Sequence, residues 1–425
     1  MPAISRDNDY IPQLCGVNTS SMENQPCLLI INCGSSGIKF AIFEAGSLKQ
    51  LLKGSISEIG TPNSVIEIRC WSDKLPEQIA RPIKNFEEAA SVLVEWLSYR
   101  KGYYPIAAIG HRMVHGGPEY FEPVRLTAEI LDHLKHYSNI APLHLPNEIK
   151  VVERLQREYT HVPQVLCFDT GFHKEMPAIS ATYPVPQKYR DAGLRKYGFH
   201  GISCEYVTRK LQRASVSVNK QNIIIAHLGS GCSLTAVSKG KSVDTTMGFS
   251  PTGGIVMSTR SGDIDPGAVL FLMRHFKMNS LQLDKLLSYE SGLKGLAGKS
   301  DIHELLKVED TDPAAALAIS IFCYAIQKSI ASLTAAMGGL DALIFTGGIG
   351  EHSAVIRERI CQGLGFLNLY INPKRNTEAR PRISKRKSKV AIRIIPTNEE
   401  LMIATHTNEI LNPINTQPNE NATNA

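Results

Sequence analysis

The sequence LLIINCGSSGIKFAIF at residues 28–43 contains an apolar strand, a Gly-Ser turn and a second strand with alternating side chains. The sequence NIIIAHLGSGCSLTAVSKG at 222–240 repeats this order, with Gly229 at the place of Gly34. Two copies of one strand–turn–strand unit favour two similar halves facing each other across a cleft. Gly-Ser turns between strands are common, so the alternative is a pair of unrelated hairpins.

Length and composition indicate a globular protein with more than one domain. The chain has 425 residues, of which 43% are hydrophobic and 20% charged. A single domain is typically ~150 residues long, and these proportions exclude wholesale disorder, a collagen-like repeat and a disulfide scaffold. The longest apolar run, 314–326, is shorter than the ~20 residues of a membrane span. Residues 1–27 lack a secretory signal, so we expect a cytoplasmic protein without membrane partners.

Strand and helix patterns mix along the chain in an α/β manner. Strands are expected at 28–32, 106–109, 164–168, 221–227 and 342–345, and helices at 86–99, 313–337 and 353–364. The helix at 313–337 has the clearest ends, because Asp312 can cap its start and Gly338 can close it in the left-handed conformation. The ends of the chain, 1–27 and 412–425, are expected to form a disordered extension and a disordered tail.

The net charge of +6 comes from one segment. Nine basic residues and one acid, Glu378, lie between Lys374 and Arg393. A single basic run is weak support for nucleic-acid binding, which normally uses several elements. We therefore expect a solvated surface turn between two strands and no nucleic-acid partner.

Three glycine-rich turns could bind phosphates. They lie at 32–39, 227–231 and 346–352. Small residues let backbone N–H groups approach an anion, and Lys39 adds a compact positive charge. Taken alone, each of these turns is more often a tight hairpin than a ligand site. Three of them together are most simply explained by one ligand, a nucleoside triphosphate.

Four polar loops could complete a site for an anionic substrate. They are 110–117, 168–173, 197–201 and 258–266. His111 and His115 have the i, i+4 spacing of a helical zinc site. The neighbouring glycines and the preceding strand favour a loop there instead, so we do not expect zinc. Each of the four loops could also be an ordinary surface loop.

The chain resembles the acetate kinases, members of the superfamily of acetate and sugar kinases, heat-shock proteins and actin. The resemblance covers about 28–411 and rests on motifs in family order: NCGSSGIK, GHRMVHGG, APLHLP, FDTGFH, RKYGFHG, HLGSG, MGFSPTGG, TRSGDIDP, FTGGIGE and IPTNEE. It implies a duplicated actin-like (ribonuclease H-like) α/β fold with a nucleotide in a central cleft. It also implies a homodimer formed largely through the C-terminal domains.

The resemblance implies an N-terminal domain at 28–170, on which 400–411 packs back, and a C-terminal domain at 171–399. It implies that Asn32 and Glu399 hold Mg²⁺, with Mn²⁺ as the alternative ion. Asp169, His200 and Arg260 would act on the transferring phosphoryl group. The acid would contact Arg112, Val114, Leu143, His144, Phe199 and Pro251. ATP, the co-substrate, would contact Ser35, Lys39, His227, Leu228, Gly229, Ser230, Gly231, Asp301, Ile302, His303, Gly348, Ile349, Gly350, Glu351 and His352.

Several positions depart from the family pattern. Gly37 stands where the family has a serine, Leu145 where it has an asparagine, Cys204 where it has a histidine and Ser258 where it has a glycine, while Ser230 and His352 replace asparagines. Three of these lie on turns expected to face phosphate or nucleotide, so they bear on ATP affinity more than on reaction type.

The reaction that the resemblance implies is direct in-line transfer from ATP to acetate, giving acetyl phosphate and ADP reversibly. A carboxylic acid is already an anion at pH 7, so the nucleophile needs no general base. The alternatives are a propionate or butyrate kinase, which differ in the size of the acid pocket, and a non-catalytic actin-like protein. The last would need neither Arg112 nor Arg260.

Overall fold

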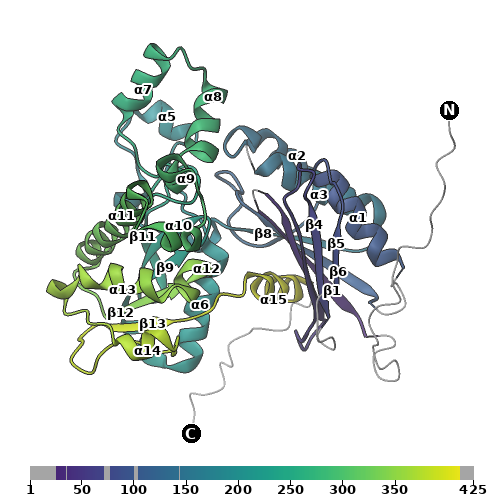
Figure 1. The fold of residues 1–425 in the computed structure, drawn as a ribbon. Coiled ribbons are helices and arrows are strands. Elements are labelled where there is room, and N and C mark those ends of the chain that lie inside the picture. Colours follow the sequence, from purple (N-terminus) through teal and green to yellow (C-terminus); the bar gives the residue numbers. More distant parts are fainter. Residues whose placement is uncertain (1–24, 35, 71–76, 100–103, 143, 412–425) are drawn as a thin grey trace, which may run out of the picture. The chain divides into compact units, whose positions relative to one another are not determined.

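The computed structural model describes residues 25–34, 36–70, 77–99, 104–142 and 144–411. They divide into two compact units, whose helices and strands are labelled in Figure 1. Unit 2 comprises Val114–Glu122 and Phe168–Met402, and unit 1 comprises the other described residues. The chain therefore passes between the units after Met113, Glu122, Cys167 and Met402.

Unit 1 is built on an eight-stranded sheet with the strand order β5-β4-β3-β2-β1-β6-β8-β7. The strands are β1 (Cys27–Cys33), β2 (Ile38–Glu44), β3 (Gln50–Ser57), β4 (Val65–Cys70), β5 (Glu77–Ala80), β6 (Ile106–Met113), β7 (Val124–Arg125) and β8 (Gln164–Phe168). The helices are α1 (Phe86–Ser98), α2 (Ala128–His136), η1 (Tyr137–Asn139), α3 (Leu145–Glu158) and the part of α15 (Glu399–Leu411) that follows Met402.

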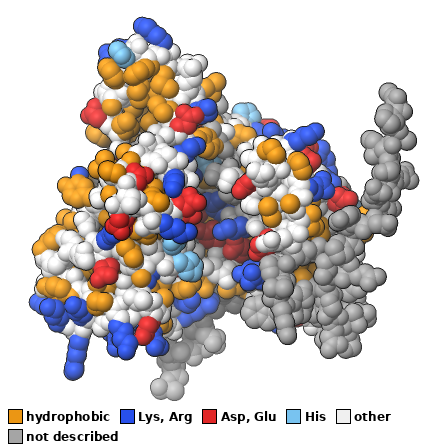
Figure 2. All heavy atoms as spheres, viewed as in Figure 1, with side chains coloured by type: hydrophobic (Ala, Val, Ile, Leu, Met, Phe, Trp, Pro, Cys, Tyr) orange, Lys and Arg blue, Asp and Glu red, His pale blue; other side chains and the backbone are white. Residues whose placement is uncertain are grey.

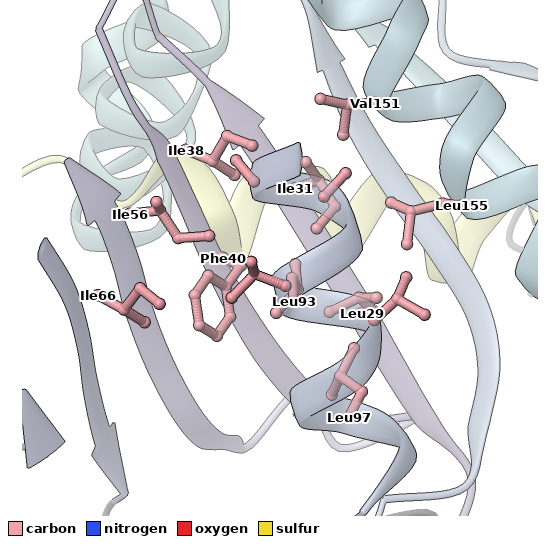
Figure 3. Packing of buried hydrophobic residues seen from close by; sticks show 14 of the residues in the cluster. Leu29, Ile31, Ile38, Phe40, Ile56, Ile66, Leu93, Leu97, Val151 and Leu155 are labelled. Atoms are coloured by element: carbon pink, nitrogen blue, oxygen red, sulfur yellow. The ribbon is translucent and has the colours of Figure 1, made fainter. Parts of the chain in front are cut away.

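One face of this sheet packs against α1 and α3. Alternate residues of β1, Leu29, Ile31 and Cys33, belong to the same buried cluster as Leu93 of α1 and Leu155 of α3. Figure 3 shows side chains of this cluster from the strands and from both helices pointing toward one another. Because successive strand residues point to opposite faces, Asn32 belongs to the other face.

The other face of the sheet contacts α15. A Cβ on Gly110 of β6 would lie 2.2 Å from Thr407 Oγ1 and 2.9 Å from a methyl carbon of Ile403, both on α15. The glycine at this position therefore lets the helix lie directly on the strand. The backbone N–H of Gly46 also donates to Asn408 Oδ1 at 3.3 Å, so the last helix is joined to the first part of the chain.

Unit 2 has a five-stranded sheet in the order β11-β10-β9-β12-β13. The strands are β9 (Asn222–Leu228), β10 (Cys232–Ser238), β11 (Lys241–Thr245), β12 (Ala342–Thr346) and β13 (Ala391–Ile394). The helices are η2 (Gly171–His173), α4 (Ala178–Ala181), α5 (Gln187–Asp191), α6 (Gly201–Ala214), η3 (Val216–Lys220), α7 (Pro266–His275), α8 (Ser280–Lys285), η4 (Leu286–Glu290), α9 (Gly292–Ala297), α10 (Ile302–Val308), α11 (Pro313–Met337), α12 (Gly347–His352), α13 (Ala354–Gln362), η5 (Gly365–Leu367) and α14 (Pro373–Thr377).

The two sheets repeat one arrangement of strands. In unit 1, β1 pairs antiparallel with β2 and parallel with β6, and β2 pairs antiparallel with β3. In unit 2, β9 pairs antiparallel with β10 and parallel with β12, and β10 pairs antiparallel with β11. The duplication inferred from the two Gly-Ser turns is therefore confirmed.

The helix α11 has the ends that the sequence predicts. Asp312 accepts from the backbone N–H of Ala314 at 3.0 Å, and Gly338 takes the left-handed conformation with φ 70°. By length and composition alone, this 25-residue helix could cross a membrane, although the apolar run at 314–326 is too short to indicate a span. Its buried face contacts β9, β10 and β11, the packing of a core helix.

Two local expectations are corrected. The motif at 110–117 was expected to be a loop, but β6 continues through His111 and Arg112 to Met113, so only Val114–Gly117 is irregular. The expected glycine turn after β12 is instead the short helix α12, and α13 follows it after Ser353. The basic run begins in α14, and all its basic side chains are exposed except the half-buried Arg393.

Candidate active site

In unit 1, three expected site residues lie in one row across neighbouring strands. Asn32 of β1 is in register with Lys39 of β2 and with Arg112 of β6. Side chains in register point to the same face of a sheet, which here is the face that α15 contacts. Asn32 is buried and Lys39 is exposed, so the row runs from the sheet interior to solvent. Strand pairing thus brings together residues that are up to 80 positions apart (112 − 32).

The turn between β1 and β2 is narrow. The backbone N–H of Gly34 donates to the carbonyl oxygen of Gly37 at 2.8 Å. A Cβ on Gly37 would lie 2.5 Å from the carbonyl oxygen of Ile56 in β3, so this turn has no room for the serine of the family pattern. Ser35, expected to contact the nucleotide, lies outside the described residues.

Arg112 is anchored at the end of β1. Its Nη1 donates to the carbonyl oxygen of Cys33 at 2.8 Å. Next to it, His111 is buried with Nε2 2.7 Å from Gln164 Oε1, and burial lowers the pKa of His111 to about 4. The described residues contain no group of three or more His, Cys, Asp or Glu that could hold a metal ion.

In unit 2, His200 occupies a strained turn immediately before α6. Its backbone is in the left-handed region, with φ 56° and ψ 28°. The buried carboxylate of Asp169 holds this turn, because Oδ2 accepts from the backbone N–H of His200 at 3.0 Å and Oδ1 from that of Ile202 at 3.4 Å. A non-glycine residue at positive φ persists only where its surroundings fix it, and such residues concentrate at functional sites.

His200 and Arg260 converge on the turn after β9. A Cβ placed on Gly231 would lie 3.3 Å from His200 Nε2 and 3.4 Å from Arg260 Nη1. The side chains of His200 and Arg260 are both only half buried. An imidazole and a guanidinium beside a small-residue turn form a ready site for an anion.

The loop that carries Arg260 is held by backbone hydrogen bonds. Met257 N–H donates to the carbonyl oxygen of Arg260 at 3.1 Å, and Ser291 N–H donates to that of Thr259 at 3.0 Å. The side chain is directed in turn by a bond from Nη1 to the carbonyl oxygen of Pro251 at 3.0 Å. Hydrogen bonds therefore hold both the backbone and the guanidinium group of Arg260.

The second and third glycine-rich segments lie together in unit 2. Thr346 of β12 is in register with His227 of β9, and a Cβ on Gly229 would lie 4.0 Å from the backbone nitrogen of Gly348. Ser230 and Gly348 are exposed, while Leu228, Ile349 and Gly350 are buried. The two glycine-rich segments are therefore neighbours, and among the residues named Ser230 and Gly348 are the ones open to solvent.

Glu351 has a structural role that the resemblance did not imply. Its Oε1 accepts from the backbone N–H of Gly347 at 2.9 Å and from that of Thr397 at 3.1 Å. The carboxylate thereby joins the start of α12 to the segment that leads into Glu399. Its neighbour His352 is exposed.

Arg357 is a residue that the sequence reasoning missed. It is 1% exposed, and its Nη1 donates to the carbonyl oxygens of Gly350 and Glu351 at 2.9 and 2.8 Å. Nε and Nη2 donate to Asn376, and burial lowers the pKa of Arg357 to about 10. A buried arginine that holds the end of the short helix α12 supports the glycine segment from behind. No local pattern around Arg357 could have revealed this long-range contact.

Asp301, Ile302 and His303 form the start of α10. Asp301 Oδ1 accepts from the backbone N–H of His303 at 2.7 Å, so Asp301 is the helix cap. Ile302 is buried, while Asp301 and His303 are exposed. Only the two exposed side chains are therefore accessible to a ligand.

The residues expected around the acid divide between the units. Val114, Phe199 and Pro251 are buried in unit 2, and the half-buried His144 precedes α3 in unit 1. Leu143 lies outside the described residues. Leu145, where the family has asparagine, is buried in α3.

His115 was considered only as a zinc ligand, but it packs beside the expected acid-pocket residues of unit 2. Its ring centroid lies 5.8 Å from that of Phe199 and 4.3 Å from that of Tyr197. Burial lowers the pKa of His115 to about 4, so the ring is neutral at pH 7. The neutral imidazole therefore contributes to an aromatic wall.

Comparisons with known proteins show which family the chain resembles over most of its length. The model of the Acetokinase family matches residues 27–405. An acetate kinase of Clostridium acetobutylicum is 40% identical over 90% of this chain and 98% of its own, and one of Rhodopseudomonas palustris is 39% identical over 89% and 97%.

Solved structures are similar over the same extent. A propionate kinase from Francisella tularensis has 37% identity and a TM-score of 0.84, covering 91% of this chain and 100% of its own. The acetate kinase of Porphyromonas gingivalis has 33% identity and a TM-score of 0.80, with the same coverage. These matches confirm the actin-like fold class that the resemblance implied.

Proposed function

This chain belongs to the acetokinase family, and we propose that it is an acetate kinase, which transfers the γ-phosphoryl group of ATP to acetate reversibly and gives acetyl phosphate and ADP. The observation that carries this proposal is the convergence of His200 Nε2 and Arg260 Nη1 on Gly231. A histidine and an arginine at a glycine turn suit the equatorial charge of a phosphoryl group in transfer.

Catalysis here consists of positioning and charge stabilisation. Acetate is an anion at pH 7 because its pKa is like that of an Asp or Glu side chain, about 4. Asp169 does not need to accept a proton from it, and the Asp169 carboxylate already accepts two backbone N–H groups. Asp169 thus holds His200 in place, His200 and Arg260 bind the phosphoryl oxygens, and Arg112 binds the carboxylate of acetate.

ATP is proposed to contact the glycine segments 227–231 and 348–352, and Lys39 is proposed to contact its phosphates. The proposed actin-like domains are 28–170 together with 400–411, and 171–399. Loss of ATP binding on substitution of exposed Gly348 by a bulky residue would support this assignment.

Asn32 and Glu399 suit Mg²⁺, with Mn²⁺ as the alternative. Both present oxygen atoms, the ligands that these ions prefer. Mg²⁺ is commonly bound by one or two protein side chains together with substrate phosphates. When bound, the ion would neutralise charge on the phosphate oxygens.

A homodimer is proposed through unit 2. On and just after α7, the side chains of Leu270, Phe271, Met273 and Phe276 are 40–60% exposed. Figure 2 shows hydrophobic atoms gathered over α7 and α8 at the top of the view. Such an apolar surface is typical of an interface between subunits. We propose no nucleic-acid or membrane partner and a cytoplasmic location.

A propionate kinase is the second candidate, because the structure from Francisella tularensis described above is of a propionate kinase. The two are distinguished by incubating the purified chain with ATP, Mg²⁺, hydroxylamine and each straight-chain acid of two to four carbons. We expect the highest kcat/KM with acetate. Preference for propionate would select the second candidate, and absence of an acyl hydroxamate from every acid would reject both.

A further inference from the structure

Two histidine rings lie face to face beside the turn at Gly231. The ring centroids of His200 and His227 are 4.2 Å apart, and their planes differ by 17°. A serine hydroxyl lies at Nδ1 of each ring, Ser233 at 2.9 Å from His200 and Ser203 at 2.8 Å from His227. Each ring is therefore held by a hydrogen bond at Nδ1 and by stacking on the other ring.

The hydrogen bonds of Ser203 define which nitrogen of His227 carries a hydrogen. Ser203 Oγ donates to Thr397 Oγ1 at 2.8 Å. A hydroxyl has one hydrogen to donate, so Ser203 accepts from Nδ1–H of His227. A neutral imidazole has a single N–H, so a hydrogen on Nδ1 leaves none on Nε2. Nε2 lies 3.9 Å from the position of a Cβ on Gly229, and in that tautomer it is an acceptor, which does not suit a phosphoryl oxygen.

We propose that His227 is a positioning residue for phosphoryl transfer: it holds the imidazole of His200 against the turn and does not bind the phosphoryl group itself. This inference rests on the proposed function, because it needs His200 to act on that group. The support continues beyond Ser203, since Thr397 N–H donates to Glu351 Oε1 at 3.1 Å. The network thus connects His200 with the segment that holds α12.

The strengths of the stacking and of the hydrogen bond predict a moderate fall in kcat when His227 is replaced. A stacked ring pair or a single neutral hydrogen bond changes an equilibrium by a factor of about 3 to 10. His227→Ala removes both, so we expect kcat to fall about 10- to 50-fold with each KM within about threefold. His227→Phe keeps a stacked ring, so its kcat should fall only about threefold. Ser203→Ala keeps both rings, and its kcat should fall by a similar factor.

A double-mutant cycle separates positioning from direct action. The kcat for acetyl phosphate formation is measured for the unmodified protein, His227→Ala, His200→Ala and the double variant. If His227 acts through His200, His227→Ala lowers kcat in the unmodified protein but by less than about twofold in the His200→Ala background. An equal loss in both backgrounds, or no loss in either, would overturn the inference.

Two further variants keep the test decisive. If His227→Ala does not fold by circular dichroism, the same cycle is run with Ser203→Ala. Ser388→Ala is the matched control, because the hydrogen bonds of the buried Ser388 Oγ are with Tyr370, Asn368 and Val390, and none of these belongs to the candidate site. It should leave kcat unchanged. An inactive unmodified protein would reject the proposed function and this inference together, whereas an equal loss in both backgrounds rejects the inference alone.

Discussion

The carboxylate of Asp169 accepts the backbone N–H of His200 at 3.0 Å, across 31 positions of sequence. The same side chain accepts from Ile202, and the carbonyl oxygen of Asp169 accepts from Gly201 at 2.7 Å. Three consecutive N–H groups at the start of α6 therefore depend on one residue. This gives the aspartate of the FDTGFH motif a definite task, to hold the histidine of the GFHG motif in its left-handed turn.

Replacing Asp169 should damage both stability and rate. Asp169→Ala removes a helix cap, which costs about 0.5–2 kcal/mol of unfolding free energy. It also frees His200, and misplacement of a reacting group by about 1 Å lowers rate about 100-fold. Urea unfolding and kcat measure the two effects. Asp169→Asn, which keeps an acceptor oxygen, should lose less of both; a loss as complete as that of alanine would indicate a need for the negative charge.

Arg112 should be required for use of the acid. Arg112→Ala is expected to lower turnover by ~10³ or more, the scale of an arginine that clamps charge in phosphoryl transfer. The fold should persist, because strand pairing of β6 does not use this side chain. Steady-state kinetics with acetate and circular dichroism test both points. Arg112→Lys keeps the positive charge but loses the planar guanidinium with its paired donors. If Arg112→Ala retains a tenth of the original kcat, the assignment of Arg112 is wrong.

Val114 should limit the size of the acid. One methylene in a hydrophobic pocket changes kcat/KM by about 10- to 200-fold, so propionate should be the poorer substrate. Val114→Ala should narrow the ratio of kcat/KM for acetate to that for propionate and leave the KM for ATP unchanged. Because Val114 is buried, the alternative is a purely structural role. In that case the variant loses stability while the acetate to propionate ratio stays the same.

Buried histidines should make stability depend on pH. Burial lowers the pKa of His111 and of His173 to about 4 from an ordinary value of 6.5. Between these pH values the unfolded chain binds more protons, so stability is full above pH 6.5 and falls as pH decreases toward 4. Each histidine should contribute a loss of about 2 kcal/mol at pH 5.

Urea unfolding at pH 7 and pH 5 measures this dependence. In His111→Gln the difference in unfolding free energy between the two pH values should shrink by about 2 kcal/mol. The exposed His161 provides the control, since His161→Gln should leave the difference unchanged. An unchanged difference in His111→Gln would contradict the burial of a neutral ring.

Local patterns predicted much of the fold. The repeated hairpins, the strand at 342–345 and both ends of α11 follow from alternation, turn glycines and caps, all within a few residues. The passage of Val114–Glu122 into unit 2 could not be anticipated, because it depends on packing with residues distant in sequence. The continuation of β6 through Arg112 has the same origin, since its partner is β1.

The sequence predicted which residues belong to the candidate site but not the contacts that hold them in place. The motifs and the resemblance identified His200, Arg260 and the glycine segments, which the structure brings together in unit 2. The stacking of His227 on His200 and the contacts of Arg357 join elements far apart in the chain. Such contacts leave no local spacing in the sequence from which they could be read.

The most direct test compares Arg260→Ala with the unmodified protein in acetyl phosphate formation, trapped with hydroxylamine in the presence of ATP, Mg²⁺ and acetate. The exposed Arg213, near the end of α6, supplies the control variant Arg213→Ala. We expect the unmodified protein and Arg213→Ala to form acetyl phosphate at similar rates, and Arg260→Ala to be slower by ~10³ or more. No product from the unmodified protein, or a tenth of its kcat in Arg260→Ala, would contradict the proposed transfer at Gly231.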